Sequence, residues 1–242
     1  MSVERRDSLD LGELHAEVIR KPIKHVHLSV YPPHGRVRIS APQAMALETI
    51  RLYAITKLGW IKRQQSKILA QERETPREYL DRESHYVWGK RYLLKIVSAD
   101  SAATIRLKHS VMELHARPSS TESKHAELLE AWYRDQIKAA VPALLQKWQP
   151  LMGVRAGRLH VQRMKTKWGG CNPATGLIRL NTDLAKKPPE CLEYILVHEL
   201  THLLEPTHNA HFQSLLGSFM PHWRQIRDEL NRLPVRHEDW IY

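Results

Sequence analysis

Three residues in one short segment have the types and the spacing of a metal-dependent hydrolase. His198, Glu199 and His202 form an HExxH sequence. Two histidines four positions apart on a helix project from the same face, so both imidazoles can bind one ion at roughly 2.0–2.1 Å. The Glu199 carboxylate lies beside them and can take a proton from a water that the metal activates. The segment therefore predicts a zinc-activated water with Glu199 as general base.

The residues before this motif predict a buried helix. Pro188 and Pro189 open it, Glu190 is an acid in its first turn, and the run up to Val197 is mostly apolar. A buried helix needs a partner for each polar side chain, and one metal ion provides a partner for three of them. At this point an alternative stays open, in which both histidines bond the backbone and Glu199 pairs with a basic residue.

A third histidine follows the helix. Pro206 ends the helical pattern, and His208 precedes a second apolar pattern, so the chain can turn and bring His208 to the metal. His211 is a rival ligand, but we expect it inside the second helix. Glu205 is a weaker rival, because it stands too near the first helix to swing back. The predicted site holds one Zn2+ per chain and leaves the fourth position for water. Its predicted ligands are His198, His202 and His208.

Four segments of the chain resemble one protein family. They are residues 164–171, 176–181 and 198–202, and then His208 and Asn209 with Phe212. In this order they are similar to the YgjP-like metallopeptidases, relatives of the SprT and WLM zinc proteases. The resemblance runs from about residue 16 to 233 and is specific over 164–212. It implies an α+β, zincin-like metallopeptidase domain in which His198, His202 and His208 bind zinc and Glu199 is catalytic. Gly170 stands where the family usually has Ser.

The region before the metal helix predicts two strands. Residues 158–164 and 177–181 have strand patterns, and residues 172–176 have turn chemistry, so we expect a hairpin. An edge strand near the metal of a zincin can bind an extended substrate through backbone hydrogen bonds. A purely structural hairpin is the alternative. The predicted substrate-binding residues are Leu177, Ile178, Leu180 and Asn181.

Two cysteines and one tryptophan stand near these elements. Cys171 and Cys191 are too few for a disulfide framework in a chain of 242 residues. We expect Cys171 to be a structural thiol, since a fourth protein ligand would close the zinc site and make it structural. Trp168 is expected to be a packing residue.

The rest of the chain predicts a tail over residues 1–15, a β-rich region over 16–118 and the zincin-like domain over 119–242. Strand pairs are expected at 26–30 with 37–40 and at 86–88 with 92–97. Helical patterns cover 48–70 and 125–148, and Pro142 is expected to kink the second or to start another helix. No internal repeat is expected.

Net charge bears on the partners of the protein. The chain has 37 Lys and Arg against 26 Asp and Glu, a net charge of +11. This excess favours phosphate backbones or acidic proteins, although the basic residues are dispersed and no nucleic-acid motif occurs. No apolar run reaches the roughly 18 residues of a membrane span, and the charged start lacks a signal peptide. A cytoplasmic location is expected.

Three functions fit these patterns. The leading one is a zinc metallopeptidase that acts on a peptide or protein. The second is a nucleic-acid-associated zinc-binding module or a protease of DNA-bound proteins. The third is a metal-dependent hydrolase of a non-peptide amide.

Overall fold

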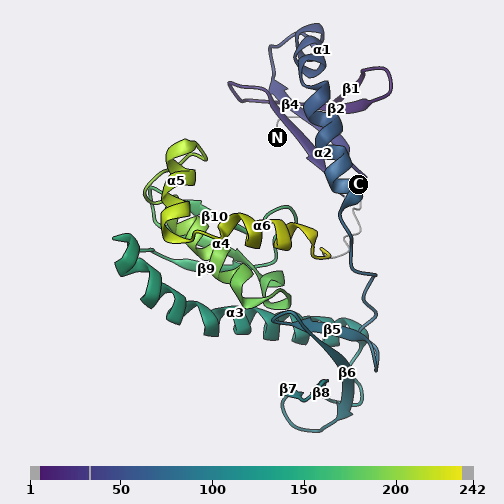
Figure 1. The fold of residues 1–242 in the computed structure, drawn as a ribbon. Coiled ribbons are helices and arrows are strands. Elements are labelled where there is room, and N and C mark those ends of the chain that lie inside the picture. The colour runs from purple at the N-terminus through teal and green to yellow at the C-terminus, as the bar shows by residue number, and fades with distance from the viewer. Residues whose placement is uncertain (1–5, 33, 236–242) are drawn as a thin grey trace. The chain divides into compact units, whose positions relative to one another are not determined.

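The computed structural model describes residues 6–32 and 34–235 (Figure 1). The described chain divides into two compact units, and the division falls between Arg73 and Glu74. The predicted boundary at residue 118 differs from this division. The observed division lies before residue 118 because residues on both sides of 118 share one core. Leu94 and Leu114, which precede residue 118, belong to the same buried cluster as Leu196 of the HExxH helix.

The first unit is a sheet with two helices. The strands have the order β1-β2-β4-β3, in which β2 and β4 are parallel and the two outer pairs are antiparallel. The predicted 1–15 tail thus contains strand β1, and the predicted helix over 48–70 is two helices that meet at Lys57. Val18, Ile39 and Ile61 lie in the core of this unit. The elements are β1 Arg6–Asp10, β2 His15–Lys21, β3 His27–Tyr31, β4 Arg36–Pro42, α1 Leu47–Thr56 and α2 Leu58–Ala70.

The second unit begins with another four-stranded sheet. Its order is β5-β6-β8-β7, again with a parallel central pair between two antiparallel pairs. The two sheets therefore share one topology, which the sequence patterns do not reveal. The predicted strand pairs at 26–40 and 86–97 are confirmed as β3–β4 and β5–β6. The strands are β5 Ser84–Val87, β6 Lys90–Ser98, β7 Thr104–Lys108 and β8 Val111–Ala116.

A long helix, α3 (Glu122–Met152), links this sheet to the site region. It begins at Thr121, whose side chain accepts a hydrogen bond from the Lys124 amide, and ends at Gly153, where φ is +66°. The helix continues through Pro142 and Pro150, so of the two outcomes predicted for Pro142, a kink or the start of another helix, the second is wrong.

The site region surrounds helix α4 (Pro189–Thr201). A three-stranded sheet, α3, α5 and α6 all contact α4 (Figure 1). The strand order is β10-β11-β9, in which β10 and β11 are antiparallel and β9 and β11 are parallel. The predicted hairpin of 158–164 with 177–181 is therefore wrong, because β10 intervenes and pairs with β11. The elements are β9 Leu159–Gln162, β10 Gly169–Asn172, β11 Leu177–Asn181, the 3-10 helix η1 Thr182–Lys186, α5 Ala210–Phe219 and α6 Trp223–Arg232.

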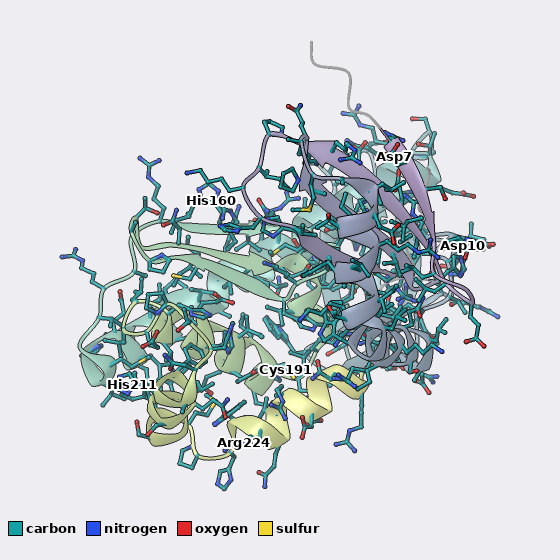
Figure 2. The ribbon with its side chains drawn as sticks, turned by 90° about the horizontal axis from the view of Figure 1, so that it is seen from above. Asp7, Asp10, His160, Cys191, His211 and Arg224 are labelled. Atoms are coloured by element: carbon teal, nitrogen blue, oxygen red, sulfur yellow. The ribbon has the colours of Figure 1, made fainter. Side chains whose placement is uncertain are left out.

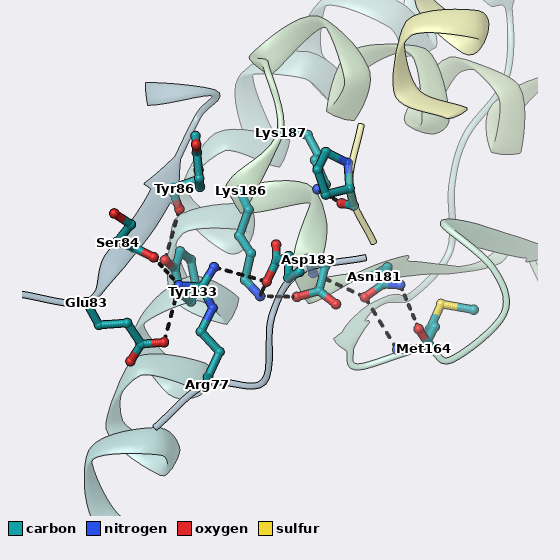
Figure 3. Close-up of polar contacts among 12 residues, drawn as sticks. Arg77, Glu83, Ser84, Tyr86, Tyr133, Met164, Asn181, Asp183, Lys186 and Lys187 are labelled. Atoms are coloured by element: carbon teal, nitrogen blue, oxygen red, sulfur yellow. Dashed lines mark hydrogen bonds and ion pairs between the residues drawn. The ribbon is translucent and has the colours of Figure 1, made fainter. Parts of the chain in front are cut away.

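A buried ionic cluster fixes the chain just before α4 (Figure 3). The Lys186 ammonium lies 2.8 Å from the Asp183 carboxylate and 3.6 Å from that of Glu74, and it lies 5.5 Å from the centre of the Tyr133 ring. Arg77 also pairs with Glu74, at 3.1 Å. Buried charges are tolerated only when they are paired, so these contacts hold η1 against α3 and the segment after Arg73.

The α+β class predicted from the sequence is confirmed. Within residues 6–32 and 34–235, no helix has the length and apolar character needed to cross a membrane.

Candidate metal centre

Helix α4 carries the HExxH residues into the core of the second unit. Pro189 stands in its first turn with Glu190, as the sequence predicts. Leu196, Val197 and Leu200 are fully buried and hold the helix against its neighbours. His198 and Glu199 lie near its end, and His202 is the residue at which the helix stops.

A short loop returns the chain to α4. The Glu205 carboxylate accepts hydrogen bonds from the Thr207 amide at 3.1 Å and from its hydroxyl at 2.9 Å, and these bonds lower the pKa of Glu205. Asn209 begins α5 by accepting a hydrogen bond from the Phe212 amide at 2.9 Å. Glu205 therefore organises the loop, and His208 is placed between these two fixed points.

Three imidazoles converge beside α4. One ring nitrogen each from His198, His202 and His208 lies within 4.8 Å of the others, and this group includes neither His211 nor Glu205. The Nε2 atoms of His198 and His208 are 2.9 Å apart. His202 Nδ1 lies 3.2 Å from the Glu205 carbonyl oxygen, which can accept a hydrogen bond from Nδ1–H and leave Nε2 free as a ligand. As predicted, His211 lies inside the second helix, where it is exposed.

Phe212 supports all three rings. Its buried ring has centroid distances of 5.0, 4.7 and 4.8 Å to the rings of His198, His202 and His208. The sequence places Phe212 on the core-facing side of a helix but does not assign it this role. Its contact with each imidazole limits how far any one of them can rotate.

The surroundings favour the neutral form of His198 and His202. Burial lowers the pKa of His198 to about 3, and the neighbouring His202 and His208 add to the effect. The pKa of His202 is lowered as well, mainly by burial. Neutral imidazole is the form that binds metals, so at neutral pH His198 and His202 need to lose no proton before they bind an ion.

Glu199 is the acid of the site, and 5 % of its surface is exposed. Burial raises the pKa of its carboxyl to about 8, while the nearby Lys167 ammonium acts in the opposite direction. A group that titrates near neutrality can both accept and release a proton. Its Oε2 atom and His198 Nδ1 are buried and make no hydrogen bond with the described residues. A cation among the imidazoles would offset the burial of this carboxylate.

The donor set fits zinc. Three histidine nitrogens are a known catalytic zinc set, which leaves the fourth position for water or substrate. The imidazoles and Glu199 also line a cavity of about 420 Å3. Its remaining lining comes from Lys167, Trp168, Gly169, Gly170, Cys171, Pro173, Ile195 and Pro206.

Gly169 allows strand β10 to pack close to helix α4. A Cβ atom at residue 169 would lie 2.6 Å from Glu199 Oε1 and 2.8 Å from Ile195 Cγ2. The next residue, Gly170, has open space at the same atom position. The sequence patterns assign no contact to Gly169, so the steric need for this glycine becomes visible only in the packed structure.

We therefore expect Gly169→Ala to displace the Glu199 carboxylate. Zinc content should stay near wild type, while peptide cleavage should fall by about 10²-fold, the scale of a roughly 1 Å misplacement of a reacting group. Gly170→Ala is the matched control and should retain most of the activity. Steady-state cleavage by the three proteins, with zinc content measured alongside, tests this expectation; equal activity of the two variants would refute it.

Comparison with known proteins identifies the chain. The model of the YgjP-like metallopeptidase domain matches residues 24–233. The chain belongs to the YgjP-like metallopeptidase family. Among solved structures, the metallopeptidase zymogen abylysin of Pyrococcus abyssi matches with 25 % identity and a TM-score of 0.35, covering 37 % of this chain and 90 % of its own. The zymogen jannalysin of Methanocaldococcus jannaschii matches with 23 % identity and a TM-score of 0.32, covering 39 % and 92 %. No curated protein matches the sequence.

In this YgjP-like chain, Cys171 and Trp168 lie on the cavity wall. Burial raises the pKa of the Cys171 thiol to about 11, and the Glu199 charge adds to the rise. The neutral thiol is thus favoured over the thiolate that binds metals. Trp168 is half-buried against the core, with Lys187 Nζ 5.8 Å from its ring centre.

The predicted substrate strand does not have a free edge. β11 is the central strand, so its backbone is paired on both sides by β10 and β9. Ile178 and Leu180 are fully buried. The Asn181 side-chain amide donates to the Met164 carbonyl at 2.8 Å (Figure 3). It also donates to the Lys167 carbonyl at 2.9 Å, and so holds the loop before β10. Substrate binding by Leu177, Ile178, Leu180 and Asn181 through strand addition is therefore wrong for this YgjP-like protein.

Proposed function

We propose that this YgjP-like metallopeptidase is a zinc enzyme that hydrolyses peptide bonds with Glu199 as general base. Its ligands are His198, His202 and His208, and each chain binds one zinc ion. The observation that carries the proposal is the placement of three converging imidazoles and a buried carboxylate, whose Oε2 atom makes no hydrogen bond with the described residues, on the wall of one cavity.

The roles of the protein groups follow from their positions. A bound zinc ion supplies Lewis acidity, which polarises the scissile carbonyl and lowers the pKa of water. Glu199 accepts a proton from the attacking water while the water oxygen bonds to the carbonyl carbon. The same carboxyl then gives its proton to the amide nitrogen as the C–N bond breaks, so that the amine leaves neutral. Gly169 keeps Glu199 in place, and Phe212 keeps the imidazoles in place.

Strand β10 is the proposed binding edge for the substrate backbone. It is an edge strand of its sheet and lines the cavity from Gly169 to Cys171. The backbone amide of Asn181 donates to the Trp168 carbonyl at 2.9 Å. Residues 168, 170 and 172 therefore point their backbone N–H and C=O groups toward β11. The backbone groups of Gly169 and Cys171 then point away from β11, where an extended peptide can pair with them.

A cleavage profile tests the peptidase assignment. Peptides from a digested proteome are incubated with the zinc-loaded wild type and with the zinc-loaded Glu199→Gln variant, and new termini are identified by mass spectrometry. We expect cleavage products that appear with the wild type and are absent with the variant. Identical sets of termini would overturn the assignment, and so would cleavage confined to non-peptide amides in a parallel substrate panel.

A further inference from the structure

One stretch of the chain contains basic side chains but no acidic ones. Between Asp135 and Asp183 there is no Asp or Glu, so this stretch contributes +8 of the net charge of +11. It contains β9, β10 and β11 and supplies the cavity wall from Lys167 to Cys171. Its eight cations are Lys138, Lys147, Arg155, Arg158, Arg163, Lys165, Lys167 and Arg179.

Strand register places one of these cations, Arg179, next to β10, the proposed substrate-binding edge, called the substrate edge below. Gly170 of β10 lies opposite Arg179 of β11, and His160 of β9 lies opposite Arg179 on its other side. Ile178 and Leu180, the neighbours of Arg179, point into the core, so Arg179 and His160 project from the opposite face of the sheet. Figure 2 shows His160 on the side of the sheet turned away from α5 and α6.

Gly170 leaves the space over β10 open. A Cβ atom at residue 170 would meet nothing within 4 Å. A substrate strand paired to β10 would lie two strand spacings from β11, about 9–10 Å. The long Arg179 side chain can cover that distance over a glycine, whereas a larger residue at position 170 would stand between Arg179 and the substrate.

A second cation lies on the metal side of β10. Lys167 lines the metal-site cavity and acts electrostatically on Glu199. Among the described residues, no carboxylate forms an ion pair with Lys167 or Arg179, whereas Lys147 pairs with Glu193 at 2.7 Å. Arg179 on one face of β10 therefore has no ion-paired carboxylate within the described chain, and Lys167 on the metal side is near Glu199 but forms no ion pair with it.

We infer that the enzyme selects substrates with acidic side chains, and that Arg179 binds the carboxylate of the substrate residue beside Gly170. Lys167 favours a carboxylate on the opposite face, near the scissile bond. The inference rests on the proposed function, since it assigns the substrate class of the same site. The nearby cations also disfavour Lys and Arg at these positions of the substrate.

A binding experiment tests the inference without requiring turnover. Two end-capped, fluorescently labelled decapeptides, alternating Ala-Glu and alternating Ala-Gln, are titrated with zinc-loaded Glu199→Gln protein. Alternation puts all the glutamates of a bound strand on one face. We expect the Ala-Glu peptide to bind about tenfold more tightly at low salt, a preference typical of one hydrogen-bonded charge pair, and salt should reduce the preference.

Three further substitutions, each made in the Glu199→Gln protein, test which residues cause the preference for the Ala-Glu peptide. Arg179→Met should remove most of it, and Gly170→Val should do so with every cation retained. Arg91→Met changes an exposed cation in a different sheet, on β6, and should leave the preference intact. Equal binding of both peptides, or equal losses in Arg91→Met and Arg179→Met, would overturn the inference. Tighter binding of a ten-residue thymidine oligonucleotide that depends on Arg179 would assign this face to nucleic acid instead.

The outcome is independent of the cleavage profile. If the wild type cleaves peptides but binds both probes equally, the peptidase proposal stands and the acidic preference fails. If the preference holds but the wild type cleaves no peptide, the face recognises acidic chains and the catalytic proposal fails.

Discussion

Replacing His208 by Ala should remove tight zinc binding, while replacing His211 by Ala should not. Both histidines follow the HExxH helix and both are exposed, but only His208 places a ring nitrogen within 4.8 Å of those of His198 and His202. Loss of a ligand should weaken zinc binding by more than the roughly 10–100-fold that is typical of changes beyond the ligands. Competition with a zinc chelator measures the difference.

His198→Ala provides the reference for this comparison, since it removes a ligand from the helix itself. We expect His208→Ala to match it, and His211→Ala to match the wild type in both zinc affinity and thermal midpoint. The reverse order of His208→Ala and His211→Ala in the competition would move the third ligand into α5.

Replacing Glu199 by Gln should lower turnover by on the order of 10² or more, the usual contribution of a general base. Gln keeps the size of the side chain and cannot accept the proton of the attacking water. Zinc content should be unchanged, because Glu199 is not in the histidine group. The initial rate of cleavage of one peptide taken from the wild-type profile measures the effect.

The thermal midpoint of Glu199→Gln is the control for folding, and we expect it to equal or exceed that of the wild type. The reason is that Oε2 of Glu199 is buried and makes no hydrogen bond with the described residues, so that the carboxylate costs free energy in the folded state. Wild-type cleavage by Glu199→Gln would assign the base to another group.

The sequence predicts the helices of the site well, because the information is local. Pro189 and Glu190 mark the start of α4, Pro206 follows its end, and the apolar spacing after His208 marks α5. The same local signals bring His198, His202 and His208 together in the prediction, and the structure places them in one cluster.

Strand pairing is predicted less well, because it depends on distant residues. β10 begins with Gly169 and Gly170, which have low strand propensity, so the sequence patterns do not reveal this strand. The prediction therefore joins β9 and β11 as a hairpin, whereas the two strands pair in parallel. The error carries over to the predicted substrate strand, since the edge strand that lines the cavity is β10. The steric role of Gly169 likewise depends on a contact with Glu199, 30 positions away in the sequence.

The difference between the predicted boundary at residue 118 and the division after Arg73 has a similar cause. The polar stretch near residue 118 resembles a linker, but Leu114 before it and Leu129 after it are buried in the same core. Burial of apolar side chains, rather than local composition, decides which segments belong to one compact unit.

The most direct test of the zinc peptidase is a titration of metal-free protein with zinc, followed by peptide cleavage. With protein at a concentration well above the dissociation constant, activity should rise linearly with added zinc and stop rising at one equivalent per chain, and the His202→Ala variant should show no rise over this range. Cleavage by metal-free protein at the wild-type rate, or full loading with zinc and no cleavage of any peptide in the digested proteome, would contradict the account.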